Sequence, residues 1–202
     1  KELGVKIADA TCPFVKKIHN IVAEKSKEGY VTIIAGDASH QEVKGIVGHT
    51  FGEVYVVANE EELQNLLKFK ENFCSKKVIM VSQTTFNAKI WEKLQLFLKK
   101  VCTNAEIFDT ICNATAMRQQ EADCLSREND CMIVIGGQHS SNTAKLYDVC
   151  SANCRHTYFV STAADLKSEW YSDKVNIGVV AGASTPAHII KEVIKTMSEN
   201  LQ

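Results

Sequence analysis

The sequence has few of the features that mark membrane-spanning, fibrous or nucleic-acid-binding proteins. Only two of its 202 residues are proline, Pro13 and Pro186. No apolar run approaches the roughly 18 residues that a membrane span needs, and no charged-then-apolar signal segment opens the chain. The net charge is −1, from 23 basic and 24 acidic side chains, with no basic block. We therefore expect neither a membrane nor a nucleic acid as the main partner.

The composition is that of a soluble globular protein with an ordinary core. Apolar residues make up 45% of the chain and charged residues 23%, close to the average for soluble domains. The length suffices for one large domain or two small ones. The chain nevertheless holds eight cysteines. A chain with this much core does not need disulfides, so we expect a reducing, cytoplasmic compartment in which most thiols are buried or incidental.

Apolar runs of strand length alternate with amphipathic helical segments along the chain. The segment 13–28 places Phe14, Ile18 and Val22 on one helical face. The candidate strands are short, continuous and rich in Val and Ile, as expected of parallel strands covered on both faces. They are residues 30–35, 54–57, 77–81, 105–108, 131–135, 157–160 and 175–180. This alternation predicts an α/β fold.

An internal repeat with a period of about 100 residues organises the chain. Four landmarks recur in the same order and pair residues 9–12 with 109–112, 31–36 with 132–137, 55–57 with 158–160, and 79–85 with 179–185. Four ordered matches are hard to obtain by chance. We therefore predict two similar parallel-sheet α/β domains, residues 1–108 and 109–202, in which Gly36 is equivalent to Gly137.

Polar clusters follow the predicted strands at equivalent places in the two copies. In parallel α/β sheets, ligands bind beyond the carboxyl ends of the strands. The clusters are Cys12, residues 36–42 and residues 82–85 in the first copy, and Cys112, residues 136–142 and residues 182–185 in the second. If the copies are arranged alike, all six clusters face one centre.

Cys12 and Cys112 are the only cysteines in equivalent positions, each just before a predicted helix. One interpretation is a pair of buried turn cysteines. The other is two ligands of one metal centre, because the positive end of a helix favours a thiolate. Zinc is disfavoured, since neither cysteine has a second one at the usual spacing. An iron–sulfur cluster would need further thiolates from another unit.

Hydroxyl and amide side chains open several of the predicted helices. Residues 140–142 (Ser-Ser-Asn), residues 84–85 (Thr-Thr) and residues 184–186 (Ser-Thr-Pro) stand at such turns. Helix capping explains each turn by itself, whereas several turns converging on one centre favour the capture of a phosphate or diphosphate. His40 could donate to such an anion, and Glu42 could carry a proton as a general acid.

Together these motifs resemble the LytB family of 4-hydroxy-3-methylbut-2-enyl diphosphate reductases, which complete the methylerythritol phosphate route to isoprenoids. The resemblance covers nearly the whole chain and rests on residues 9–13, 40–45, 82–85, 109–112, 140–142 and 181–186. It implies a trefoil of three similar α/β domains around a central [4Fe-4S] cluster that is held by one cysteine from each domain. The implied reaction is a two-electron reductive dehydroxylation to isopentenyl and dimethylallyl diphosphate, with ferredoxin or flavodoxin as the electron donor.

The resemblance also implies roles for individual residues. Cys12 and Cys112 match the cluster ligands of the second and third domains. Glu42 matches the family's proton donor, and Thr84 matches a threonine near the substrate hydroxyl. The substrate-binding residues implied are His40, Thr84, Thr85, Ser140, Ser141, Asn142 and Ser184.

The family's first domain, with its cysteine and two further substrate histidines, has no counterpart in this sequence. None of the other six cysteines lies in a matching motif. We therefore expect the second and third domains of a reductase, with a cluster that is absent or incomplete until the missing first domain joins as a partner. Two alternatives stay open: a phosphate-binding domain pair without redox activity, and a non-catalytic scaffold fragment.

Overall fold

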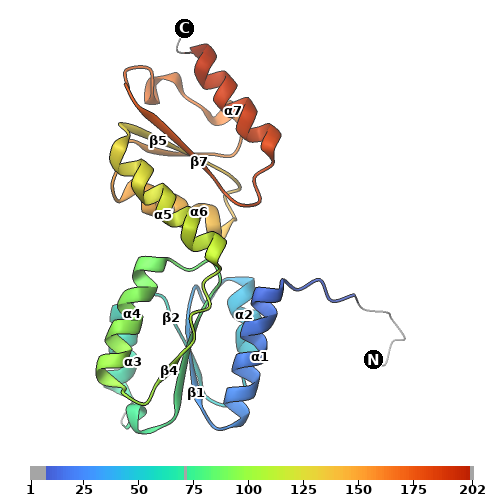
Figure 1. Ribbon diagram of the computed structural model, residues 1–202, viewed down its shortest axis with the longest axis vertical. Helices are drawn as coiled ribbons and strands as arrows, with labels where there is room; N and C mark the ends of the chain where they lie inside the picture. Colours follow the sequence, from blue (N-terminus) through green and yellow to red (C-terminus); the bar gives the residue numbers. More distant parts are fainter. Residues whose placement is uncertain (1–7, 71, 201–202) are drawn as a thin grey trace. The chain divides into compact units, whose positions relative to one another are not determined.

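The computed structural model describes residues 8–70 and 72–200. The chain divides into two compact units between Ile111 and Cys112. Each unit is built on its own parallel sheet (Figure 1), so the predicted α/β class is confirmed. Within the described residues, no helix is both long and apolar enough to cross a lipid bilayer.

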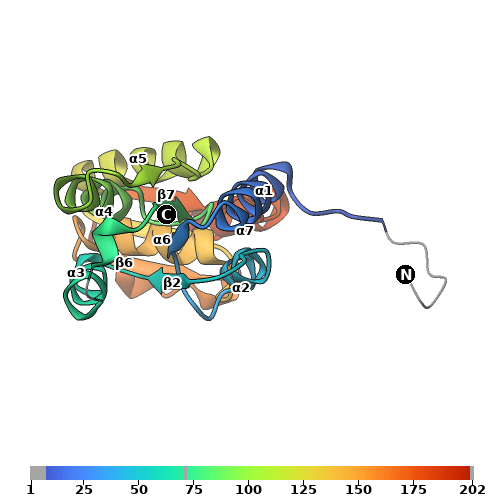
Figure 2. The same cartoon turned by 90° about the horizontal axis from the view of Figure 1, so that it is seen from below.

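The first unit is a parallel sheet with helices on both faces (Figures 1 and 2). Its strand order is β2-β1-β3-β4, and the central strand β1 pairs with β2 on one side and β3 on the other. The elements of this unit are α1 (Pro13–Lys27), β1 (Val31–Ala35), α2 (Gln41–Gly48), β2 (Val54–Val57), α3 (Glu60–Phe69), η1 (Phe73–Ser75), β3 (Val78–Ser82), α4 (Ala88–Val101) and β4 (Glu106–Ile107).

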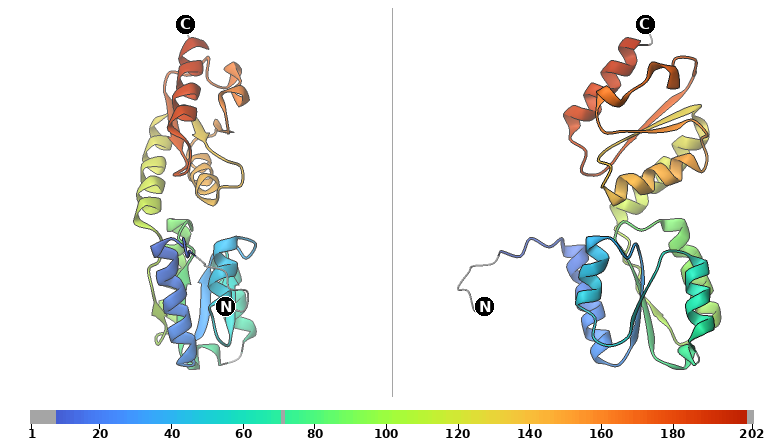
Figure 3. Two further views of the ribbon diagram at one scale, coloured as in Figure 1. Left: turned by 90° about the vertical axis from the view of Figure 1, so that its right-hand side faces the viewer. Right: turned by 180° about the vertical axis from the view of Figure 1, so that it is seen from behind.

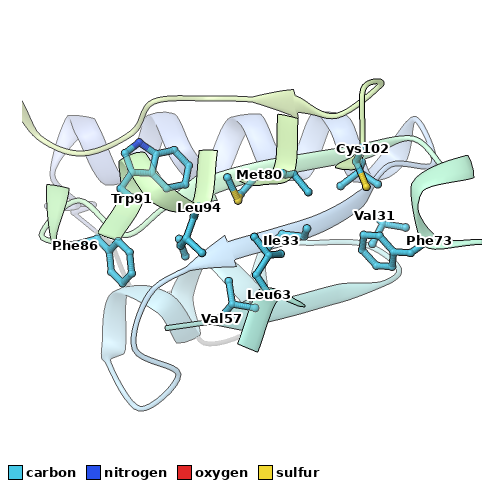
Figure 4. Close-up of a cluster of buried hydrophobic side chains, with 13 residues drawn as sticks. Val31, Ile33, Val57, Leu63, Phe73, Met80, Phe86, Trp91, Leu94 and Cys102 are labelled. Carbon is cyan, nitrogen blue, oxygen red and sulfur yellow. The ribbon is translucent and has the colours of Figure 1, made fainter. Parts of the chain in front are cut away.

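Two apolar layers hold this sheet between its helices. Side chains alternate along a strand, so Ile33 faces α3 and α4 whereas Ile34 faces α1 and α2. Figure 4 shows the first layer, in which Ile33 lies beside Leu63 and Trp91 packs near Leu94. Because both faces of the sheet are buried, the polar residues that could bind a ligand lie at the strand ends.

The second unit repeats this plan around the strand order β6-β5-β7 (Figure 3). α5 and α6 cover one face, with Met132 and Leu146 in the layer between, and α7 covers the other face, with Ile133 and Val193. The elements of this unit are α5 (Asn113–Glu128), β5 (Cys131–Ile135), α6 (Ser141–Ser151), β6 (Thr157–Val160), η2 (Ala163–Asp165), η3 (Ser168–Trp170), β7 (Ile177–Ala181) and α7 (Ala187–Asn200).

The two units share their strand order, which supports the repeat, but their hydrogen bonds correct its alignment. The amide of Gly36 donates to the carbonyl of Val57, and the amide of Gly136 donates to the carbonyl of Val160. Gly36 is therefore equivalent to Gly136, and the expected equivalence with Gly137 is wrong by one residue. The physical reason is that each glycine directly follows the central strand, where the next helix approaches too closely for a Cβ atom.

The last landmark of the repeat slips by one residue in the same way. The amide of Gln83 donates to the carbonyl of Ala35, and the amide of Gly182 donates to the carbonyl of Ile135. Gln83 is thus equivalent to Gly182, so the hydroxyl equivalent to Ser184 is that of Thr85. Matching by residue type alone missed this shift because both turns are rich in hydroxyl residues.

Most predicted elements agree with the structure, and the differences lie at their ends. The strands predicted at residues 54–57, 131–135 and 157–160 are found with those bounds, whereas β4 covers only Glu106–Ile107. Phe14 was expected on the buried face of α1, but 54% of its surface is exposed. Phe14 stands in the first helical turn, and the buried stripe begins only one turn later at Ile18.

The compact units divide three residues after the boundary expected at Asp109. The indole nitrogen of Trp91 donates to Asp109 Oδ1 at 3.1 Å. The hydroxyl of Thr110 donates to the backbone carbonyl of Ser82 at 2.7 Å. The first residues of the second sequence repeat are therefore held by α4 and β3 of the first unit.

Cys74 and Cys102 form a disulfide, with their Cα atoms 4.9 Å apart. The expectation of reduced thiols is thus wrong for these two residues. Cys74 lies in η1 just before β3, and Cys102 ends α4, which returns to the amino edge of the sheet. A separation of 28 residues carries no recognisable spacing signal, so only the packing of α4 reveals the pair.

We expect the double variant Cys74→Ser/Cys102→Ser to weaken the first unit by about 3–4 kcal/mol, because the crosslink restricts a 28-residue loop in the unfolded chain. Hydrogen exchange of the β1 and β3 amides, measured without reductant, reports this loss. The matched control is Cys124→Ser, which removes a free, exposed thiol. Equal protection in the double variant and the control would contradict the prediction.

Candidate functional site

Glu42 and Thr84 are paired at the carboxyl edge of the first sheet. Glu42 lies in the first turn of α2, directly after the turn that ends β1, and Thr84 follows β3. The Thr84 backbone amide donates to Glu42 Oε1 at 2.6 Å, and the Thr84 hydroxyl donates to Glu42 Oε2 at 2.7 Å. The two oxygens of one carboxyl group thus hold both the backbone and the side chain of Thr84.

His40 caps the helix that carries Glu42. Its Nδ1 atom accepts the backbone N–H of Glu42 at 3.1 Å. A neutral imidazole that accepts at Nδ1 carries its proton on Nε2. The half-buried His40 therefore presents an N–H donor beside the positive end of α2, where the helix dipole also favours an anion.

Gln83 is a site residue that the sequence interpretation passed over, although it stands inside the Ser-Gln-Thr-Thr motif. It is buried, and its side-chain oxygen accepts the amide of Asp37 at 3.2 Å. Its side-chain nitrogen donates to the hydroxyl of Thr85 at 3.0 Å. Gln83 thus ties the turn after β1 to the turn after β3 and places Thr85 within this cluster.

The N-cap residue of the helix after Thr84 and Thr85 is neither of these two threonines. The cap of α4 is Asn87, whose side chain accepts the amide of Ile90 at 3.0 Å. Both threonine hydroxyls instead bond to side chains at the strand ends, to Glu42 and Gln83 respectively. The Thr84 hydroxyl thus serves the carboxylate of Glu42, and the Thr85 hydroxyl accepts from Gln83.

In the second unit, the first turn of α6 carries the corresponding polar residues. Ser140 caps the helix by accepting the amide of Thr143 at 3.3 Å, so capping is confirmed there, and Ser141 is half-buried behind it. Asn142 occupies the position of Glu42. Its side chain is 92% buried, and neither its oxygen nor its nitrogen has a hydrogen-bond partner among the described residues.

An unpartnered buried amide costs free energy, and Asn142 has both a donor and an acceptor in that state. The Thr143 hydroxyl beside it is also buried and has no partner within the described chain. These groups make the first turn of α6 an incomplete hydrogen-bonding site. A polar ligand that supplies both a donor and an acceptor would complete it.

Gly136 and Gly182 make the space in which Thr143 lies. A Cβ atom on Gly136 would come within 2.6 Å of the Thr143 hydroxyl oxygen, and one on Gly182 would overlap the same oxygen. The two strand-end turns of this unit therefore close around Thr143. Side chains at these two glycines would push the first turn of α6 away from the sheet.

We expect Gly182→Ala to lower the unfolding free energy of the second unit by about 1–3 kcal/mol, because overpacking displaces Thr143. Gly137→Ala is the matched control, since a Cβ atom at that glycine meets no atom within 4 Å. Hydrogen exchange of the β5 amides measures both variants. If Gly182→Ala proves as stable as Gly137→Ala, the close approach of Gly182 to Thr143 does not contribute to the stability of the second unit.

Ser184 lies on the exposed turn after β7. Its neighbour Thr185 is held by a hydrogen bond from its hydroxyl to the carbonyl of Ile135 at 3.1 Å. This bond fixes the turn next to the end of the central strand β5. The Ser184 side chain is thereby placed at the same edge of its sheet as Ser140 and Asn142.

Cys12 and Cys112 begin α1 and α5 at equivalent positions. The carbonyl of Cys12 accepts the amide of Lys16 at 2.9 Å, and that of Cys112 accepts the amide of Ala116 at 3.0 Å. Neither side chain caps its helix, and both thiols are free; Cys12 is exposed and Cys112 is half-buried. Both sulfur atoms therefore remain open to a ligand at the start of a helix.

Asp9 holds the backbone segment that precedes Cys12. The Asp9 carboxylate accepts the side chain of Lys16 at 2.7 Å and the backbone amide of Thr11 at 3.0 Å. These bonds, that of Lys16 foremost, hold the pKa of Asp9 well below its usual range. Asp9 therefore stays ionised and keeps the exposed residues before α1 attached to the helix.

Three other free thiols, those of Cys131, Cys150 and Cys154, are buried. Burial raises the pKa of Cys131 to about 11 and that of Cys150 to about 12, with Cys154 nearby adding to both shifts. Burial therefore disfavours the thiolate form of Cys131 and Cys150. No group of three or more His, Cys, Asp or Glu side chains in the described part of the chain could hold a metal ion.

The structure thus brings some of the predicted site residues together within each unit. In the first unit, Glu42 contacts Thr84 and His40 caps the same helix turn. In the second unit, Ser140, Ser141 and Asn142 share the first turn of α6. The meeting of these two sets, and of the two cysteines, around one centre stays a prediction.

The chain matches a known protein family along almost its entire length. The sequence profile described as "LytB protein" matches residues 1–198. The 4-hydroxy-3-methylbut-2-enyl diphosphate reductase of Caldanaerobacter subterraneus subsp. tengcongensis is 46% identical over 195 residues, which are 96% of this chain and 66% of that protein. The reductase of the same name from Campylobacter hominis is 42% identical over 198 residues, covering 98% of this chain and 70% of that protein.

Solved structures show the same similarity. The E-1-hydroxy-2-methyl-but-2-enyl-4-diphosphate reductase from Plasmodium falciparum has a TM-score of 0.84 at 29% identity, covering 93% of this chain and 58% of that one. A structure of (E)-4-hydroxy-3-methyl-but-2-enyl diphosphate reductase has a TM-score of 0.56 at 35% identity, covering 98% of this chain and 69% of that one. The chain therefore spans about two thirds of the length of the relatives that it matches.

Proposed function

This chain belongs to the LytB protein family, and we propose that it forms two of the three domains of an iron–sulfur-dependent 4-hydroxy-3-methylbut-2-enyl diphosphate reductase. The substrate class comes from the names of its relatives. In this proposal, the remaining third of those relatives' length corresponds to a first domain that completes a trefoil. The complete enzyme would yield isopentenyl and dimethylallyl diphosphate.

The pairing of Glu42 with Thr84 is the observation that carries the proposal. Replacing an allylic C–OH group with C–H consumes two electrons and two protons and releases water. The Thr84 hydroxyl stands 2.7 Å from Glu42 Oε2. When that carboxyl group is protonated, it would donate its proton to Thr84 Oγ1 while the Thr84 hydroxyl gives its own proton to the departing hydroxyl. Positioned proton donors of this kind contribute about 10²- to 10⁴-fold to a rate.

The diphosphate is proposed to bind at the helix starts. His40 offers an N–H group at the start of α2, and Ser140, Ser141 and Asn142 offer hydroxyl and amide donors at the start of α6. Ser184 and Thr85 add hydroxyls from the equivalent turns after β7 and β3. The unpartnered amide of Asn142 supports this assignment, because a bound phosphate oxygen would accept hydrogen bonds from its N–H groups and the substrate hydroxyl or a bound water would donate to its oxygen.

Cys12 and Cys112 are proposed as two of the thiolate ligands of a [4Fe-4S] cluster. They fit this role because both are free thiols at equivalent helix starts and neither is used as a cap. When bound, such a cluster would supply electrons and an iron site that polarises the substrate's C–O bond. Two thiolates do not complete the set, so we place a third cysteine in the first domain.

The partners follow from the reaction. A one-electron carrier such as ferredoxin or flavodoxin is proposed as the donor, because the reduction needs two electrons that the substrate does not provide. We place the enzyme in the cytoplasm, where such carriers work; six of the eight cysteines are free, as that compartment favours. The Cys74–Cys102 disulfide lies at the opposite edge of its sheet from the site.

The test compares this chain alone with the same chain fused to the first third of the Caldanaerobacter relative. After anaerobic reconstitution, we expect the fusion to hold four irons per chain and to reduce the substrate, and the chain alone to do neither. Turnover by the chain alone, with a full cluster, would contradict the partial ligand set. A fusion that loads iron and binds the substrate but never reduces it would contradict the reductase assignment.

A phosphate-binding domain pair without redox activity is the second candidate, and the unpartnered Asn142 amide favours it. The two candidate functions differ in whether they need iron: reduction requires the cluster, whereas phosphate binding by itself does not. If the chain alone binds isopentenyl diphosphate without iron, and this binding is lost in Asn142→Ala but kept in Asn153→Ala, the binding role stands by itself. Asn153 is the control because its amide bonds within the second unit, to Asp123 and Ser126.

A further inference from the structure

The chain leaves the first unit through one buried threonine, Thr110. Its hydroxyl oxygen accepts the backbone N–H of Ser82 at 2.7 Å and donates to the backbone carbonyl of Ser82 at 2.7 Å. The Ser82 hydroxyl is a further partner at 3.0 Å. Thr110 is 92% buried and Ser82 is fully buried. The Thr110 side chain thus bonds to both the N–H and the carbonyl group of Ser82, as a neighbouring strand would do at the end of β3.

The equivalent segment of the first repeat is held differently. There, Asp9 bonds to Lys16 of the helix that follows it. In the second repeat, Asp109 bonds to Trp91 of α4, and Thr110 bonds to Ser82 of β3, both within the first compact unit. The second segment is thus anchored to the sheet behind it rather than to the helix ahead of it.

We propose that Thr110 is a positioning residue that holds the backbone before Cys112 at the carboxyl end of β3. Cys112 follows Thr110 by two residues, so its Cα atom lies within about 7 Å of that of Thr110. Thr84 follows Ser82 by the same two residues. The buried hydrogen bonds between Ser82 and Thr110 therefore hold the backbone two residues before Cys112, the proposed cluster ligand. The same bonds hold the backbone two residues before Thr84, the proposed proton relay.

This inference rests on the proposed function, because the placement of Cys112 matters only if that thiol binds the cluster. The side-chain chemistry makes it specific. A serine at position 110 could form all three hydrogen bonds, whereas a valine of the same shape could form none and would leave the Ser82 amide unpaired. Thr110→Ser and Thr110→Val therefore separate the hydroxyl from the volume of the side chain.

The test uses the whole chain without iron, with the Cys74–Cys102 disulfide intact and no reductant present. It measures alkylation of Cys112 by iodoacetamide, with Cys12 as the internal reference. In Thr110→Val, we expect the Cys112 rate to rise about tenfold relative to Cys12 and the Ser82 amide to lose its protection from hydrogen exchange. Thr110→Ser should restore both values. Thr157→Val is the matched control, because it removes another buried hydroxyl bond, to the carbonyl of Cys154.

Ser82→Ala provides a second variant if Thr110→Val does not fold, because it keeps both backbone bonds to Thr110 and removes only the hydroxyl contact. We expect a smaller rise in the Cys112 rate, about threefold. An unchanged ratio of Cys112 to Cys12 alkylation in the folded Thr110 and Ser82 variants would overturn the inference. The alkylation measurement needs neither cluster nor substrate. Its outcome can therefore be judged even if the reductase test of the proposed function fails.

Discussion

Replacing Cys112 with serine in the fused, three-domain protein is expected to abolish both the iron–sulfur cluster and the reductase activity. A serine hydroxyl does not ionise near neutral pH and is a poor substitute for a thiolate on iron. The half-buried Cys112 thiol starts α5 without capping it, so the substitution should leave the helix intact. We expect activity to fall at least about a thousandfold, with iron content close to zero. Cys12→Ser should have the same effect.

Iron determination, the visible spectrum of the cluster and a reductase assay measure this result under anaerobic conditions. Cys124→Ser is the control, because Cys124 is an exposed free thiol on α5, the helix that Cys112 begins. It should retain full iron content and turnover. A Cys112→Ser protein that keeps a stoichiometric cluster would show that this residue is not a ligand.

Replacing Glu42 with glutamine is expected to slow turnover by about 10²- to 10⁴-fold while the cluster remains bound. The glutamine oxygen can still accept the Thr84 amide, as Glu42 Oε1 does. Its amide nitrogen cannot accept the Thr84 hydroxyl or hold an acidic proton. The loss should therefore appear in kcat rather than in KM, because the carboxylate faces the proposed proton relay rather than the diphosphate donors.

Steady-state kinetics of the reconstituted fusion measure this effect, with iron content checked in the same sample. Glu53→Gln is the matched control, since that exposed carboxylate pairs with Lys76 at the other edge of the sheet. It should leave kcat unchanged. A Glu42→Gln enzyme with normal kcat would exclude Glu42 as the proton source and leave it the role of holding Thr84.

Short-range patterns were enough to predict the fold class and the candidate residues. Runs of Val and Ile indicated the strands, and polar residues directly after them indicated the edge at which a ligand would bind. Glu42 and Thr84 were both expected at this edge, and the structure joins them by two hydrogen bonds. These signals are local, because strand periodicity and turn chemistry depend on neighbouring residues.

By itself, the sequence determined the α/β class, the repeated unit and the family motifs, including both candidate cysteines. Only the tertiary structure decided which residues meet: Glu42 with Thr84 across 42 positions, and Cys74 with Cys102 across 28. It also decided that Gly36 is equivalent to Gly136 and that Thr110 belongs to the first unit. The physical reason is that strand pairing and helix packing bring distant segments together, and a shift of one residue in register changes every partner.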